Sequence, residues 1–254
     1  MRTLEEIFQF LCTLAPLELQ MDFDNSGLLI GRREAPIQKV LLALDITDEV
    51  IDEAISQGAQ LVVSHHPIIF HKLAAVTDMD NDDTILRMAE HHIAAICMHT
   101  NLDIAEGGVN DVLIQLLGAS DDEALDKYGC GRVGSLPCTQ TLNSFLEQCR
   151  IRLHTNGLRY YDSGKEVSRI AVLGGAGGDA LYDAAKKGCD TFVTADVKYH
   201  QFLDAARLGI NLIDADHFCT ENPVIPILAE KLADKFPDVR FKISERHHAL
   251  ISFY

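Results

Sequence analysis

The sequence predicts an α/β protein built from two pseudo-repeated lobes, each with a mainly parallel sheet covered by helices. First, short and continuously apolar runs alternate with helical patterns, and parallel strands covered on both faces are apolar along their whole length. Second, residues 40–66 align without a gap on residues 170–196, so that strand falls on strand and Gly58 falls on Gly188. At 254 residues, the chain is long enough for two compact lobes.

The first lobe is expected to span residues 1–125. Thr3 and Glu6 form a capping box at the start of a helix. The apolar side chains that follow are spaced as one helical face: Leu4, Ile7, Phe8 and Leu11. Residues 22–31 are a polar turn that leads into a short apolar strand. Apolar runs and helical spacing then predict strands at 40–44, 60–64 and 93–98, and helices at 48–57, 83–91 and 109–117.

The middle of the chain, residues 126–167, is less regular, and we expect it to bridge the two lobes without an inserted domain. It contains one helical pattern and a strand predicted at 158–162. The apolar face of that helix consists of Leu142, Phe145, Leu146 and Cys149. The second lobe is then expected to span residues 168–254, with its own copy of the strand and helix order.

Composition excludes some classes of binding partner and indicates the cellular compartment. The formal net charge is −16, which argues against nucleic acid and anionic membranes because both attract basic surfaces. The seven cysteines form no Cys-x-x-Cys pair, which is typical of a reduced, cytoplasmic protein. No run approaches the roughly 18 apolar residues of a membrane span, and the N-terminus shows no secretion signal. We therefore expect a soluble cytoplasmic protein.

Three stretches place histidine and carboxylate side chains directly after predicted strands. They contribute His65 and His66, His99 and Asp103, and His217 and Glu221. Loops at the carboxyl ends of parallel strands form the ligand crevice of an α/β sheet, so two lobes that face each other would place all six residues around one cleft. Imidazole and carboxylate together suit divalent first-row metals. We therefore expect a metal cleft between the lobes.

Five or six mixed ligands exceed the four of a tetrahedral zinc site and suit two ions that share carboxylates. Such a pair can lower the pKa of a bound water, which makes hydrolysis the expected reaction class. The ligand types do not distinguish zinc, iron, manganese and nickel. The histidine pairs at 91–92 and 247–248 are interpreted as structural, and Cys219 as a small buried residue rather than a ligand.

Two further stretches carry alternative or additional functions. The segment 175–180, Gly-Ala-Gly-Gly-Asp-Ala, has the form of a dinucleotide-binding turn, with Asp196 about twenty residues further on. A nicotinamide-dinucleotide-binding protein is therefore an alternative, although a tight turn between strand and helix also needs small residues. Asp196, Lys198 and His200 occupy the strand-end position that mirrors the first histidine pair, and they are candidate catalytic residues.

These motifs resemble those of the NIF-three-like family, whose bacterial members are labelled GTP cyclohydrolase 1 type 2 homologues or dinuclear metal centre hexameric proteins. The matching segments are Ser64-His65-His66-Pro67, His99-x-x-x-Asp103, Asp196-Val197-Lys198-Tyr199-His200 and His217-x-x-Thr220-Glu221. Residues 24–28, Asp-Asn-Ser-Gly-Leu, also resemble the family's Trp-Asp-Asn-x-Gly-Leu stretch, with Phe23 where tryptophan is usual. The resemblance runs in order from residue 1 to residue 254.

The resemblance implies a two-lobed α/β fold with two divalent ions per chain in the cleft between the lobes. It implies as ligands His65, His66, Asp103, His217 and Glu221, with His99 as a candidate sixth. It also implies a toroidal homohexamer and the absence of the inserted domain that longer members carry. The activity stays open between a metal-dependent hydrolase of a nucleotide-like or phosphorylated small molecule and a protein that stores or delivers iron or another divalent ion.

Overall fold

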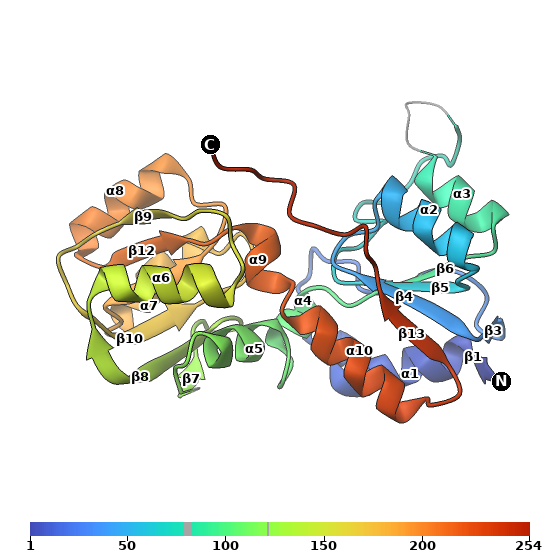
Figure 1. Ribbon diagram of the computed structural model, residues 1–254, viewed down its shortest axis with the longest axis horizontal. Coiled ribbons are helices and arrows are strands. Elements are labelled where there is room, and N and C mark those ends of the chain that lie inside the picture. Colours follow the sequence, from blue (N-terminus) through green and yellow to red (C-terminus); the bar gives the residue numbers. More distant parts are fainter. Residues whose placement is uncertain (79–82, 121) are drawn as a thin grey trace. The chain divides into compact units, whose positions relative to one another are not determined.

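The computed structural model describes residues 1–78, 83–120 and 122–254, and it divides the chain into two compact units (Figure 1). Unit 1 consists of Met1–Ala105 and Ile225–His248. Unit 2 consists of Glu106–Val224 and Ala249–Tyr254. The division therefore falls about twenty residues before the expected boundary at 125, and residues 225–248 belong with the first unit rather than the second.

The sheet of unit 1 has five strands in the order β13-β4-β5-β6-β2. Three parallel strands form its centre: β4 (Lys39–Ala43), β5 (Leu61–Ser64) and β6 (Ala94–Cys97). β2 (Gly27–Ile30) pairs antiparallel with β6, and β13 (Arg240–Ile243) pairs parallel with β4. The pairing of β13 with β4 explains why residues 225–248 belong to unit 1: sequence periodicity identifies a strand but not its distant partner.

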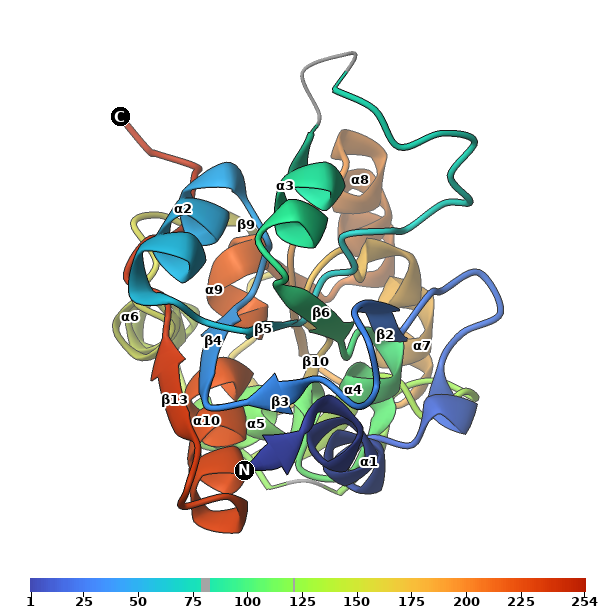
Figure 2. The same cartoon turned by 90° about the vertical axis from the view of Figure 1, so that its right-hand side faces the viewer.

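Helices cover both faces of this sheet, with α2 and α3 on one side and α1 and α10 on the other (Figures 1 and 2). Their bounds are α1 (Leu4–Leu14), α2 (Asp48–Gln57), α3 (Thr84–Glu90), α4 (Thr100–Ile104) and α10 (Val224–Lys235). The short elements of unit 1 are β1 (Arg2–Thr3), η1 (Leu17–Leu19) and β3 (Pro36–Ile37). The predicted capping box is present, with Glu6 N donating to Thr3 Oγ1 at 3.3 Å and Thr3 N donating to Glu6 Oε2 at 2.8 Å. Gly58 ends α2 with φ +63°, as its predicted role as a C-cap requires.

The sheet of unit 2 has six strands in the order β7-β8-β10-β11-β12-β9. Their bounds are β7 (Glu123–Ala124), β8 (Arg132–Gln140), β9 (Arg159–Tyr161), β10 (Val167–Val172), β11 (Thr191–Thr194) and β12 (Asn211–Asp214). β10, β11 and β12 run parallel, while β8 and β9 flank them in antiparallel orientation. Residues 126–167 are therefore not a bridge. They supply β8 and β9, because the long strand β8 pairs along β10 and the helix between them packs on the same sheet.

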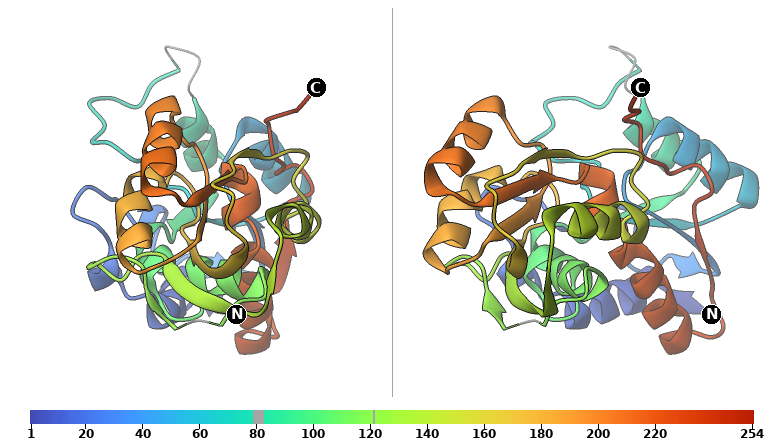
Figure 3. Two further views of the ribbon diagram at one scale, coloured as in Figure 1. Left: turned by 90° about the vertical axis from the view of Figure 1, so that its left-hand side faces the viewer. Right: turned by 60° about the vertical axis from the view of Figure 1, so that its left-hand side comes forward.

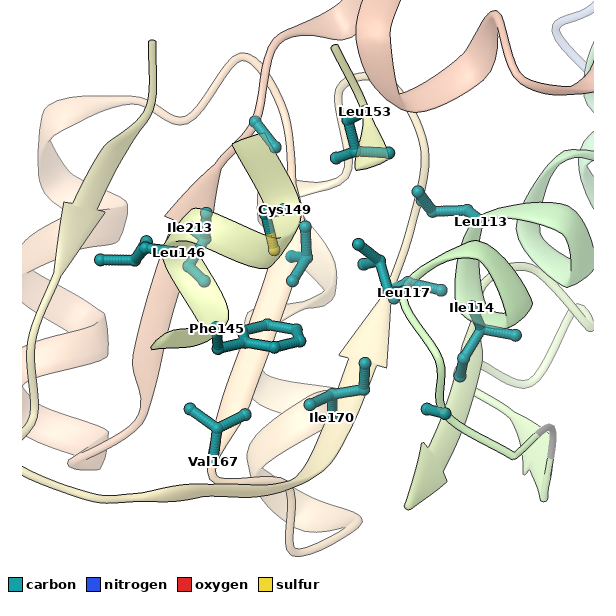
Figure 4. Close-up of a cluster of buried hydrophobic side chains, with 14 of the residues drawn as sticks. Leu113, Ile114, Leu117, Phe145, Leu146, Cys149, Leu153, Val167, Ile170 and Ile213 are labelled. Carbon is teal, nitrogen blue, oxygen red and sulfur yellow. The ribbon is translucent and has the colours of Figure 1, made fainter. Parts of the chain in front are cut away.

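Both faces of this sheet are covered, by α5 and α6 on one side and α7 and α8 on the other (Figure 3). The helices of unit 2 are α5 (Val109–Leu116), α6 (Leu142–Arg152), η3 (Gly178–Ala180), α7 (Leu181–Lys186), α8 (Tyr199–Leu208) and α9 (His217–Glu221). Alternate residues of a strand point to opposite faces. Accordingly, Ile170 lies in the cluster with Phe145 of α6 (Figure 4), whereas Ala171 lies in the cluster with Leu181 of α7.

The predicted repeat is present as a common strand register. Val40 pairs with Leu61 in unit 1, and the aligned residues Ile170 and Thr191 pair in unit 2. In the third strand of each set, Ala94 is equivalent to Asn211, because both pair with aligned positions. Within residues 1–78, 83–120 and 122–254, the helices are too short or too polar to cross a bilayer.

Candidate metal centre

Unit 1 gathers three imidazole rings where β5 and β6 end. His65, His66 and His99 each offer a ring nitrogen, and these nitrogens lie within 4.8 Å of one another. The ring centroids are 5.0 Å apart for His65 and His66, 5.3 Å for His65 and His99, and 5.5 Å for His66 and His99. The sequence places all three directly after strands, and the parallel pairing of β5 with β6 brings those strand ends side by side. This histidine cluster was predicted from the sequence.

Each ring of the cluster is held through its Nδ1 atom. His65 Nδ1 lies 2.8 Å from the Met98 carbonyl oxygen, His66 Nδ1 lies 2.6 Å from Asp45 Oδ1, and His99 Nδ1 lies 2.7 Å from Asp24 Oδ1. A carbonyl oxygen only accepts, so the His65 Nδ1 atom carries the proton and the Nε2 atom is the acceptor of the ring. Metal-ligating histidines show this arrangement, in which an outer acceptor fixes the ring and its tautomer.

Asp103 adds a carboxylate to the cluster from α4. Its Oδ1 atom lies 3.6 Å from His65 Nε2, and the residue is buried at 9% exposure. The first turn after β6 brings it there, because Asp103 N donates to the His99 carbonyl oxygen at 3.1 Å and so closes that turn. Unit 1 therefore assembles imidazole nitrogen and carboxylate oxygen around one point.

Asp24 is the most connected carboxylate beside the cluster. It accepts hydrogen bonds from His99 Nδ1, from the Thr100 hydroxyl and backbone N–H, and from Ser26 Oγ. Burial raises the pKa of Asp24, but the hydrogen bonds from His99 and Thr100 outweigh it and hold this pKa well below its usual range. The polar turn that the sequence shows at 22–31 is therefore also the support of His99.

Unit 2 carries a second, smaller group at the start and end of α9. His217 Nε2 lies 3.1 Å from Glu221 Oε2, one helical turn away, and His217 Nδ1 lies 2.7 Å from Asp196 Oδ2. Glu221 is buried at 4% exposure. Asp216 caps the helix by accepting from Cys219 N at 3.0 Å. The predicted pair of His217 and Glu221 thus forms a second cluster with the same outer support.

The glycine-rich loop after β10 packs against this second cluster. Gly175 has φ +67°, and a Cβ atom added there would overlap Glu221 Oε1 and lie 3.1 Å from His217 Nε2. The loop amides are used inside the protein: Gly174 N donates to Asn110 Oδ1, Gly175 N to Thr220 Oγ1 and Gly177 N to Thr194 Oγ1. These three amides are therefore used inside the protein rather than directed at a dinucleotide phosphate. Close approach to Glu221 explains Gly175, whereas Gly177 and Gly178 lie against Thr194 and Gln201.

The candidate catalytic residues have separate positions. Asp196 lies 2.7 Å from His217 Nδ1 and so orients that imidazole ring. Lys198 and His200 are exposed at the start of α8, where Lys198 N donates to Gln201 Oε1 at 2.8 Å. Burial raises the pKa of the Cys219 thiol to about 12, which fits the predicted buried, uncharged residue.

The histidine pair at 247–248 has a structural contact, as predicted. The backbone N–H of Leu44, just past the end of β4, donates to His247 Nδ1 at 3.2 Å. Sequence reasoning missed the supporting roles of two carboxylates, Asp24 at His99 and Asp45 at His66. For Asp45, its position at the carboxyl end of β4 was the available signal, because the same rule identified the proposed ligands.

The donors fit the chemistry of divalent metals. Imidazole Nε2 atoms and carboxylate oxygens converge in each cluster, and each of the imidazoles named is held at Nδ1. Fold and donors together define the class: an α/β protein of two sheets that carries candidate divalent-metal ligands at the carboxyl ends of its parallel strands.

Comparison with known proteins identifies the family. The family model described as Duf34/NIF3 (NGG1p interacting factor 3) matches residues 2–249, and the chain belongs to this family. A GTP cyclohydrolase 1 type 2 homolog of Clostridium perfringens is 36% identical over 251 residues, covering 95% of this chain and 96% of that protein. The resemblance noted in the sequence is thereby confirmed.

Solved structures of similar proteins have the same fold. A Bacillus cereus protein related to NIF3 superposes with a TM-score of 0.92 at 26% identity, covering 100% of this chain and 99% of that one. The Staphylococcus aureus protein SA1388, described as hypothetical, superposes with a TM-score of 0.90 at 28% identity, covering 99% of each chain. The predicted α/β fold is confirmed.

Proposed function

We propose that this protein binds a pair of divalent metal ions and uses them to hydrolyse a nucleotide-like or phosphorylated small molecule. The proposed ligands are His65, His66, Asp103, His217 and Glu221, with His99 as a sixth. The observation that carries the proposal is the support of each imidazole at Nδ1, which leaves Nε2 directed away from the acceptor. Three of these supported rings, those of His65, His66 and His99, also offer nitrogen atoms within 4.8 Å of one another, which isolated structural histidines do not require.

The histidines and the carboxylates of the two clusters have different proposed roles. When bound, two divalent ions lower the pKa of water and neutralise charge that develops during a displacement at phosphorus or carbon. The histidines fix the positions of the donors, while Asp103 and Glu221 contribute negative charge and are the residues proposed to be shared between ions. The name of the Clostridium perfringens relative contains a cyclohydrolase, and a nucleotide-like substrate agrees with that name.

Metal analysis of untagged protein purified without oxygen tests the proposal directly. We expect two equivalents of a first-row divalent metal, and release of phosphate or a ring-opened product when the loaded protein is screened against phosphorylated small molecules. Asp103→Ala should lose both ions, since a shared carboxylate serves both. Asp234→Ala, an exposed carboxylate on α10, is the matched control and should keep them. Retention of one full equivalent in Asp103→Ala would show that Asp103 serves a single ion.

A carrier of iron or another divalent ion is the second candidate function. It is favoured by partial exposure of the proposed ligands, at 23% for the His66 side chain and 31% for that of His217, which gives exchange partners access. Transfer of ions to a chelator within seconds, together with no turnover in the screen, would support the carrier. Slow exchange together with turnover would support the hydrolase.

We also propose a homohexamer, on the basis of the family resemblance. Sedimentation of the untagged protein should give a mass six times that of the 28.1 kDa chain. A monomer or dimer at micromolar concentration would contradict this assembly.

A further inference from the structure

Two exposed phenyl rings border the histidine cluster of unit 1. The ring centroids of Phe23 and Phe70 lie 6.4 Å apart, and the two residues are 67% and 39% exposed. The Phe70 ring also lies 6.1 Å from the His99 ring. The phenyl rings are tilted by 53° to each other and do not stack face to face, and the His71 ring lies edge-on to Phe70 at 4.8 Å. Large aromatic side chains left open together are typical of a binding surface.

The loop that orients His99 also positions these rings. Asp24 accepts from His99 Nδ1, and its neighbour Asn25 donates from Nδ2 to the Ile69 carbonyl oxygen at 2.6 Å. Phe23 precedes this pair in the chain, and Phe70 follows Ile69. One loop therefore ties both phenyl rings to the imidazole of a proposed metal ligand. Groups that are held before a ligand arrives lose less entropy when it binds.

We propose that Phe23 and Phe70 form a subsite for a planar aromatic ring carried by the small molecule that binds the metal centre. This inference rests on the proposed function and names the chemical class of its substrate. A molecule whose donor atoms bind ions held by His66 and His99 would extend to within reach of the Phe70 ring. Phenyl faces offer no hydrogen bonds and no positive charge, so they favour an aromatic ring over a phosphate or a sugar.

Paired hydroxamates test the subsite, because they share one metal-binding group and differ in the part beyond it. The metal-loaded protein is titrated with benzohydroxamate and with acetohydroxamate, and the ratio of the two dissociation constants is measured by calorimetry. Phe23→Ala and Phe70→Ala should each lower the preference for benzohydroxamate by about tenfold and leave acetohydroxamate binding unchanged. Phe23→Trp should keep the preference, since indole also offers an aromatic face.

Tyr182→Ala is the control, since Tyr182 is an aromatic residue of α7 in unit 2 that is 50% exposed, and its ratio should equal that of the wild type. An unchanged ratio in the Phe23 and Phe70 variants with full metal content would overturn the subsite alone. Absence of bound metal and of both hydroxamates would overturn the proposed function and the subsite with it. Dissociation of an oligomer in Phe23→Ala, seen by sedimentation, would assign the rings to contact with a second copy and would also overturn the subsite.

Discussion

The two units share one strand and helix order but use equivalent positions differently. After β5, unit 1 places His66, and after β11 the aligned residue of unit 2 is Asp196. The first is a proposed ligand, whereas the second supports a ligand, since it holds His217 Nδ1. The repeat therefore determines where side chains meet, and the residue type at each position determines which one would bind the metal.

The turns that begin α4 in unit 1 and α9 in unit 2 also use equivalent positions differently, with the histidine shifted by one residue. By strand register, His99 is equivalent to Asp216, and each is the N-cap of a short helix, α4 or α9. His217 is the first residue inside its helix, so it lies one turn from Glu221. His99 and His217 each precede a carboxylate by four residues, but by strand register the two histidines are one position apart. In unit 1 the N-cap position is therefore held by the histidine itself, whereas in unit 2 it is held by Asp216 and the histidine follows.

The supports of the imidazoles also differ in strength. His65 is held by a backbone carbonyl and its side chain is fully buried, while the His217 side chain is 31% exposed and is held by an exposed aspartate. An imidazole that is buried and held by the main chain has little freedom to leave its position. The ligands of unit 1 should therefore contribute more to metal affinity than those of unit 2, and the predictions below test that difference.

The largest effect is expected from removing ligands. His65→Ala should lower metal affinity by at least about 100-fold, because it removes a proposed ligand from the buried cluster, and should destabilise the protein by about 2 kcal/mol. His217→Ala should lower metal affinity by about tenfold, with a stability change below about 0.5 kcal/mol. Calorimetric metal titration and urea unfolding measure both. His200→Ala, on the exposed start of α8, is the control and should keep full affinity. Equal losses in the two ligand variants would remove the distinction between the units.

The next effect concerns the glycine loop of unit 2. Gly175→Ala introduces a Cβ that overlaps Glu221 Oε1, so it should cost more than the left-handed backbone alone, at least about 2 kcal/mol, and should weaken metal binding. Gly188 also has a left-handed conformation, with φ +73°, but an added Cβ there meets nothing within 4 Å. Gly188→Ala should therefore cost about 1 kcal/mol and leave metal binding unchanged. Urea unfolding of metal-free protein measures the loss of stability, and a metal titration measures the loss of metal affinity separately.

A smaller effect is expected from the outer carboxylates, which are matched between the units. Asp45 supports His66 and Asp196 supports His217, and their side chains are 46% and 48% exposed. Asp45→Asn and Asp196→Asn should each lower metal affinity by about tenfold, because an amide can present the wrong tautomer to the ring. Since both supports are similarly exposed, the two losses should agree within about threefold. A loss of turnover in Asp196→Asn at full metal occupancy would instead assign it a role in proton transfer.

The smallest effect is a difference in the response to pH. Leu44 and Gly174 are aligned positions in the two units. The backbone N–H of Leu44 donates to His247 Nδ1 in unit 1, and that of Gly174 donates to Asn110 Oδ1 in unit 2. Burial lowers the pKa of His247 from its usual 6.5, so the unfolded chain takes up a proton more readily than the folded one. This residue therefore reduces stability as the pH falls below about 6.5, and the penalty is absent above it.

His247→Asn should remove that part of the pH dependence while keeping an acceptor for Leu44 N. The free energy of unfolding should fall less between pH 7.5 and 5.5 in His247→Asn than in the wild type, by about 0.5 kcal/mol, as measured by urea unfolding of metal-free protein. His248→Asn, at the exposed neighbouring position, is the control. A pH response identical to that of the wild type would show that His247 keeps an ordinary pKa.

The sequence was sufficient for local structure and for the proposed ligands, and insufficient for distant pairing. His65, His66 and Asp103 could be identified because strand ends and helix starts follow from periodicity and capping. The place of residues 225–248 could not be identified, since nothing in a run such as Arg240–Ile243 names β4 as its partner. Asp45 was missed because a lone aspartate after a strand has no repeated signature, and its role depends on the His66 ring beside it.

The discontinuity of unit 1 has a consequence for biosynthesis. The chain leaves this unit after Ala105 and returns only at Ile225, so β4 has an open hydrogen-bonding edge until Arg240–Ile243 have been made. The strands of unit 2 lie between residues 123 and 214 and are complete on the ribosome well before that point. An unpaired edge next to an apolar strand invites intermolecular association. Ribosomes that stall between residues 225 and 240 should therefore yield nascent chains that depend on chaperones, because His217 and Glu221 have then been synthesised while the first sheet is still unfinished.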